Sequence, residues 1–160
     1  MVKKAKKNIT IKDVAEDVGA FSLLAIRSAE PDTRMAWLLN RALHLDFVHY
    51  RDLCGREPDS PLQPTVFDES KPEERRQFAV FCATDSLLQR SYILITNRQG
   101  GESLVKKLAQ VDYLLKIPEA LHDDELATLG AAIRAIPGVQ ACITVTDESK
   151  NEPLLVTLEA

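Results

Sequence analysis

The sequence predicts an α+β domain, a mainly antiparallel sheet of about six or seven strands with two helices packed on one face. Three observations support this fold class. Strand-like segments outnumber helical ones, neighbouring strand-like segments are joined by hairpin-length links, and the C-terminal half alternates strand, helix and strand. The chain has 160 residues, of which 45% are hydrophobic and 28% charged, so it can bury one core without metal or disulfide support.

The N-terminal part of the chain predicts a tail, a strand and a helix. Residues 1–8 carry four lysines and are expected to form a disordered basic tail, whereas residues 9–160 are expected to form a single domain. Ala20–Ser28 is a short apolar run of the kind found in buried strands. A helix is predicted to begin at Pro31, because proline is favoured at the first helical position. Its apolar residues recur at helical spacing: Met35, Leu38, Leu39 and Ala42.

Three strands and a long loop are predicted next. Asp46–Leu53 alternates like a strand with one wet face. One face of that strand is expected to carry Phe47, His49 and Arg51. Residues 55–72 contain four prolines and are expected to form a long loop without regular hydrogen-bond ladders. Gln77–Thr84 and Arg90–Thr96 are expected to pair as an antiparallel hairpin, and the glycines of Asn97–Glu102 predict a turn after it.

The C-terminal part predicts a βαβ unit followed by one more strand. Val111–Ile117 alternates so that one face is clearly apolar. The helix predicted over Asp123–Ile136 has an acidic start and stops at a Pro-Gly pair. Val139–Thr146 alternates again, and Leu154–Leu158 is predicted to be the final strand.

Composition indicates a cytoplasmic protein that does not cross a membrane. No apolar run approaches the roughly 18 to 20 residues that span a bilayer, and no signal-peptide pattern follows the first methionine. The odd set of cysteines, Cys54, Cys82 and Cys142, lacks CxxC spacing and fits reduced thiols. A net charge of −4 argues against a duplex-binding protein, which normally concentrates Lys and Arg on one face.

The reactive side chains predict no catalytic, cofactor-binding or metal-binding site. Cys82, with Asp85 after it and His49 before it, is the best cysteine candidate, but it lies in an apolar strand where core packing is the expected role. The histidines show neither HxxxH nor HExxH spacing. The Gly-Gly pair after a strand lacks the flanking residues of a phosphate-binding loop.

A candidate interaction surface is expected where polar and aromatic residues border the core. In the second half of the chain, Asp112 is expected to point across an open sheet face towards Lys116, while Tyr113 faces the helices. Trp37 lies beside the apolar stripe of the first helix, and Asn40 and Arg41 extend the polar surface. The alternative interpretation of Asp112 and Lys116 is a cross-strand polar pair worth about 0.2 to 1 kcal/mol.

Four stretches resemble a bacterial family known by its motif as IPExxxVDY. Ala36–Leu43 reads AWLLNRAL and Val111–Ile117 reads VDYLLKI, with further similarity at Ile9–Val14 and Ile136–Val139. The likeness, in order and approximate spacing, covers most of the chain from Ile9 to Val145. The resemblance implies a small cytosolic protein, and no activity or catalytic residue comes with it.

The chain departs from that family at the first half of the naming motif. Val105, Lys106 and Lys107 stand where the motif has Ile-Pro-Glu, ahead of an intact Val-Asp-Tyr. The resemblance therefore implies no role that needs a proline kink or a carboxylate at these positions.

Three functions fit these observations. The first is a non-enzymatic binding module that contacts a protein partner or a second copy of itself through an exposed sheet face or the rim around Trp37. The second is an RNA-associated protein, suggested by the lysine-rich tail, Lys106-Lys107 and Arg75-Arg76. The third is a small-molecule sensor of the ACT type, suggested by the C-terminal βαβ unit.

Overall fold

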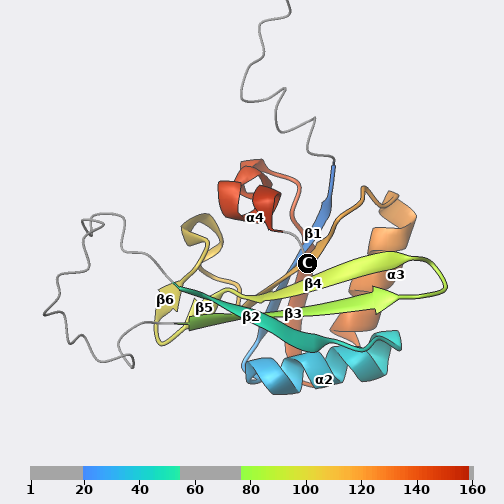
Figure 1. Ribbon diagram of the computed structural model, residues 1–160, viewed down its shortest axis with the longest axis horizontal. Coiled ribbons are helices and arrows are strands. Elements are labelled where there is room, and N and C mark those ends of the chain that lie inside the picture. Colours follow the sequence, from blue (N-terminus) through green and yellow to red (C-terminus); the bar gives the residue numbers. More distant parts are fainter. Residues whose placement is uncertain (1–19, 55–76, 159–160) are drawn as a thin grey trace, which may run out of the picture.

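The computed structural model describes residues 20–54 and 77–158, and they form an α+β structure (Figure 1). The predicted basic tail and the whole of the predicted loop at 55–72 lie outside the described residues. The main sheet has six strands in the order β2-β3-β4-β7-β1-β8. These strands are β1 (Ser22–Ser28), β2 (Val48–Cys54), β3 (Gln77–Asp85), β4 (Arg90–Thr96), β7 (Tyr113–Ile117) and β8 (Val139–Thr144).

Every neighbouring pair in this sheet is antiparallel, which confirms the predicted fold class. Strands β7 and β8 lie on either side of β1, so they run parallel to each other with β1 between them. Helix α3 (Asp123–Arg134) connects them. The C-terminal βαβ unit is therefore present, in the split form in which another strand separates its two strands. The predicted hairpin is formed by β3 and β4.

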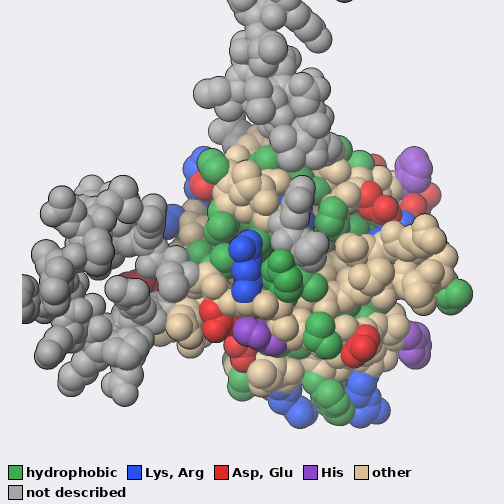
Figure 2. All heavy atoms as spheres, in the orientation of Figure 1, with side chains coloured by type: hydrophobic (Ala, Val, Ile, Leu, Met, Phe, Trp, Pro, Cys, Tyr) green, Lys and Arg blue, Asp and Glu red, His purple; other side chains and the backbone are tan. Residues whose placement is uncertain are grey.

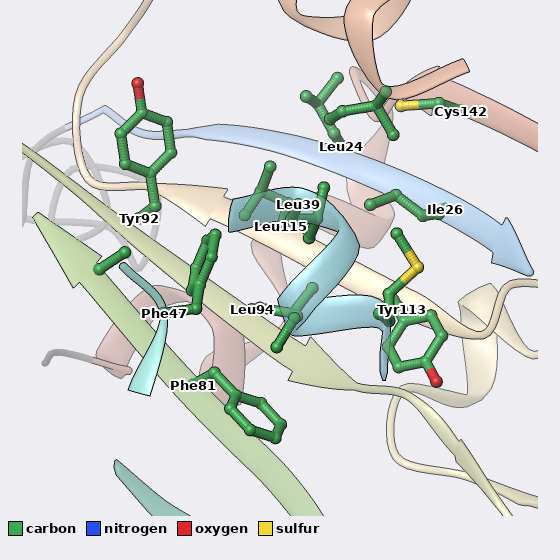
Figure 3. Close-up of a cluster of buried hydrophobic side chains, with 14 of the residues drawn as sticks. Leu24, Ile26, Leu39, Phe47, Phe81, Tyr92, Leu94, Tyr113, Leu115 and Cys142 are labelled. Atoms are coloured by element: carbon green, nitrogen blue, oxygen red, sulfur yellow. The ribbon is translucent and has the colours of Figure 1, made fainter. Parts of the chain in front are cut away.

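One face of the sheet packs against α2 (Asp32–Leu43) and α3, as the amphipathic spacing predicts. The core on this face joins side chains from both helices and from five strands. Figure 3 shows part of this cluster, including Leu24, Leu39, Phe47, Leu94 and Leu115. Burial of these apolar side chains is the main stabilising contribution, at about 25 cal/mol for each Å² removed from water.

The opposite face is covered as well, although the sequence suggested an open one. A second apolar cluster lies there, built from β1, β3, β4, β7 and the segments that follow β6 (Glu102–Ser103) and β8. The covering segments are the short helices η2 (Lys106–Leu108), η3 (Glu148–Asn151) and α4 (Pro153–Thr157). All five residues of β7 are consequently buried. A strand covered on both faces carries no solvent-exposed surface, whatever its alternation suggests.

The prediction of a final strand is wrong, because Leu154–Leu158 lies mostly within α4. Its short run of apolar residues fits a strand, but the side chains that enter the core are Leu155 and Leu158, three residues apart as on a helix. Pro153 occupies the first helical turn, where its fixed φ favours helix. A run of five residues is too short for periodicity alone to decide between the two structures.

Strand β2 contains a bulge that changes which side chains share a face. His49 aligns with Phe81 and Arg51 with the next residue, Val80, so Tyr50 is the extra residue. Arg51 therefore joins the face of the second cluster rather than the face of His49, which corrects the predicted alternation. The bulge lies on a strand at one edge of the sheet, where bulges discourage pairing with another chain.

Candidate binding groove between α2 and α3

An open groove of about 580 Å³ lies between α2 and the C-terminal end of α3. Its volume falls within the range of about 300 to 1,000 Å³ that is usual for ligand sites. One wall consists of residues on a single stripe of α2, and the other consists of two alanines, an isoleucine and a proline from the end of α3 and the turn after it. The lining residues are Trp37, Leu38, Arg41, Ala42, Ala132, Ala135, Ile136 and Pro137.

The hollow follows from side-chain size on the two helices. Leu39 and Ile133 are fully buried and hold α2 and α3 against the sheet. The residues that face Trp37 from the end of α3 are Ala132 and, just after the helix, Ala135, whose side chains end at Cβ. The indole of Trp37 on α2 projects much farther. A large side chain opposite small ones leaves a recess that the chain itself does not fill.

Trp37 is the principal exposed aromatic group of this groove. It is the only tryptophan of the chain and is 45% exposed. The guanidinium groups of Arg34 and Arg41, at 5.4 and 4.9 Å from the ring centroid, make cation–π contacts with it. Figure 2 shows basic side chains beside hydrophobic ones along the edge of the molecule formed by α2. An aromatic ring held between two cations is thus presented to solvent.

The two arginines differ in their remaining contacts. Arg34 Nε lies 3.3 Å from Glu30 Oε2, so its charge is paired within one helical turn. Arg41 is the only charged residue among the eight that line the groove. No carboxylate among the described residues forms an ion pair with it.

Asn40 does not contribute to this groove, although the sequence placed it on the same surface. Its Oδ1 accepts a hydrogen bond of 2.6 Å from the backbone N–H of Phe47, and its Nδ2 donates to the carbonyl of Phe47. His44, in the left-handed conformation with φ of 54°, ends the helix just before this contact. The amide of Asn40 therefore fixes the reversal from α2 into β2, which is a structural role.

The prediction of a surface contact between Asp112 and Lys116 is wrong. Asp112 Oδ2 accepts a hydrogen bond of 2.9 Å from the backbone N–H of Ser28, at the end of β1. Tyr113, the next residue, donates from its hydroxyl to the carbonyl of Glu30. Figure 3 shows this tyrosine at the margin of the core with its hydroxyl directed outward. Together, the two side chains fix the connection from β1 to α2.

Lys116 lies inside the second cluster and is only 3% exposed. Its Nζ donates hydrogen bonds to the carbonyls of Leu158 at 2.8 Å and Val156 at 3.4 Å, and lies 4.7 Å from the centre of the Phe21 ring. The amine therefore satisfies carbonyls at the C-terminal end of α4. The sequence missed this role because the expected final strand would have left the face open.

The other exposed apolar side chains lie away from this groove. Leu87 and Leu88 are 93% and 61% exposed at the tip of the β3–β4 hairpin. Val48 and Tyr50 are exposed on the edge strand β2, and Ile143 is exposed on β8 at the opposite edge. Single exposed apolar residues are common on protein surfaces. Trp37 differs from them because it lines a recess.

The structure does not bring the cysteine candidate together with its expected partner. Cys82 aligns with Val48, whereas His49 aligns with Phe81, so the thiol and the imidazole lie on opposite faces of the sheet. Burial raises the pKa of the Cys82 thiol, and the charge of Arg51 only partly opposes this. His49 Nε2 instead lies 2.8 Å from Asp52 Oδ1. Within residues 20–54 and 77–158, no cluster of His, Cys, Asp and Glu fits a metal ion.

The buried thiol of Cys142 is expected to make stability depend on pH in alkali. Burial raises its pKa from 9.0 to about 11, against a smaller opposing effect of the Arg134 charge. The unfolded chain therefore ionises first, so the stabilising effect is complete below pH 9.0 and is lost as pH rises through about 11. Over this range, the melting temperature of Cys142→Ala should fall less steeply than that of the wild type. If the melting temperatures of the two proteins fell in parallel as pH rises, the raised pKa of Cys142 would be contradicted.

No helix in the described part of the chain is long and apolar enough to cross a membrane. Comparisons of the chain with protein-family models, with curated proteins and with solved structures find no match.

Proposed function

We propose that this chain is a non-enzymatic protein-binding module and that its contact site is the groove between α2 and α3. The observation that carries the proposal is the half-exposed Trp37 on the wall of an open, largely apolar recess. Tryptophan and arginine are the residues most enriched among those that dominate binding energy in protein interfaces. The groove offers one of each, next to aliphatic side chains.

The position of the groove also supports a binding role. One wall is part of α2 and the other is formed by the end of α3 and the turn after it, and both helices are anchored on the sheet, so the recess is present without a partner. A preformed site loses little conformational entropy on binding. Helix pairs commonly bind an amphipathic segment of another protein along the groove between them.

Two further proposals accompany this one. We infer a cytoplasmic location, supported by Cys82 and Cys142, which are free thiols in the structure. We also propose that the resemblance to the IPExxxVDY family reflects a shared fold. The proposal is supported by the hydrogen bonds of Asp112 and Tyr113, because these two residues of the motif stabilise the connection from β1 to α2.

Site-specific photo-crosslinking in the native cell tests the binding role. A benzophenone amino acid would replace Ala42, which lines the groove, or Ala127, an exposed alanine of α3 that does not. We expect Ala42 to capture a defined protein that Ala127 does not capture. The purified partner should then bind Trp37→Ala about 30-fold more weakly than the wild type, as for a strong interface residue.

The control is the fold of Trp37→Ala, which should keep its circular dichroism spectrum because the indole is largely outside the core. Equal capture at both alanines would contradict the proposal. So would a partner whose affinity is unchanged by Trp37→Ala, or a groove that takes up only small molecules.

A further inference from the structure

We infer that the partner segment bound by the groove carries an Asp or Glu side chain next to apolar side chains. The inference rests on the proposed function and names the chemistry of the occupant. It follows from the charge of the groove, which differs from the charge of the whole chain. The chain has a net charge of −4, yet the one charged residue that lines the groove is Arg41.

The guanidinium of Arg41 is held in place but keeps donors available. Its carbon lies 4.9 Å from the centre of the Trp37 ring, which is a cation–π contact. A guanidinium carries five N–H donors, and a cation–π contact leaves them free to form hydrogen bonds. A guanidinium that contacts a ring has already lost part of its freedom, so it loses less entropy when it binds a carboxylate through two parallel hydrogen bonds.

Arg34 contacts the same ring but is engaged elsewhere. Its Nε lies 3.3 Å from Glu30 Oε2, and this pair sits at the N-terminal end of α2. The same carboxylate lies close to Gly138, where an added Cβ would come within 2.9 Å of Glu30 Oε1. The ion pair therefore belongs to the packing between α2 and the turn after α3. The charge of Arg34 is compensated, and that of Arg41 is left for a partner.

The rest of the lining determines what should flank the carboxylate. Leu38, Ala42, Ile136 and Pro137 offer only aliphatic side chains to an occupant. Apolar side chains of the partner would be buried against them, which contributes about 0.8 kcal/mol for each methylene group. A basic residue at the position of the carboxylate would be repelled by Arg41 and left without a counterion.

Selection of random short peptides displayed on phage, with the full chain as target, tests this inference. We expect the selected peptides to share an Asp or Glu beside aliphatic or aromatic residues, and to lose binding to Trp37→Ala. Changing the shared acid to its amide, and Arg41→Gln in the protein, should each weaken binding about 10-fold or more, as for a hydrogen bond to a charged group.

Arg34→Gln is the matched control, because it removes an equal charge from the same aromatic ring. It should weaken binding less than about 3-fold, since the charge of Arg34 is already paired. The sole tryptophan provides the readout by fluorescence titration. Peptides that need Trp37 but carry no shared acid, or that ignore Arg41→Gln, would overturn this inference and leave the proposed function standing. Failure to select any peptide that depends on Trp37 would overturn both.

Discussion

Replacing Asn97 with alanine is expected to lower the free energy of unfolding by about 3 to 5 kcal/mol, since three buried backbone groups each lose the hydrogen bond that they make with its side chain. Asn97 is completely buried after β4. Its Nδ2 donates to the carbonyls of Leu108 at 2.8 Å and Val111 at 2.9 Å, and its Oδ1 accepts from the N–H of Val105 at 2.9 Å. One side chain thus holds the whole connection from β6 to β7 against the second cluster.

Urea denaturation at neutral pH measures this loss. Gln99→Ala, at an exposed position two residues farther along, is the control and should change stability by less than about 0.5 kcal/mol. A loss of under about 1 kcal/mol for Asn97→Ala would mean that water or a shift of the backbone replaces the three hydrogen bonds.

The second large effect is expected at Leu155, where substitution by alanine should cost about 2 to 5 kcal/mol. Leu155 is 0% exposed and anchors α4 on the sheet beside Leu158. Its neighbour Leu154 is only partly buried, so Leu154→Ala should cost clearly less. The two leucines form a matched pair that distinguishes a helix from a strand.

If the segment were the strand predicted from the sequence, Leu154 and Leu158 would share the buried face and Leu155 would face solvent. Leu154→Ala would then destabilise the protein more than Leu155→Ala. Thermal or urea unfolding of both variants decides between the two structures. A larger loss for Leu154→Ala would contradict the helix.

The sequence predicted the elements whose pattern is long enough to be unambiguous. Helices α2 and α3 each contain 12 residues, so apolar spacing and end signals agree along their length. The strands of the β3–β4 hairpin were found from apolar runs around a short link. Errors occurred where the pattern was short, as in α4, or where one extra residue shifted the alternation, as at Tyr50 in β2.

The candidate site could be predicted only in part, because half of it depends on contacts between distant segments. Trp37 and Arg41 were identified from their position beside the apolar stripe of one helix. Ala132 and Ala135 carry no chemical signal, and their importance lies in being small next to Trp37. Asp112 and Lys116 were assigned to a surface because nothing local revealed that the C-terminal segment covers that face.

The most direct test of the account is the magnetic resonance signal of the single indole N–H. Trp37 is the only tryptophan of the chain, so one such signal is expected. On titration with the captured partner, or with a selected acidic peptide, this signal should shift together with the backbone signals of Arg41, Ala132 and Ala135. An indole signal that stays in place while signals from the edge strands β2 or β8 move would contradict the groove as the binding site.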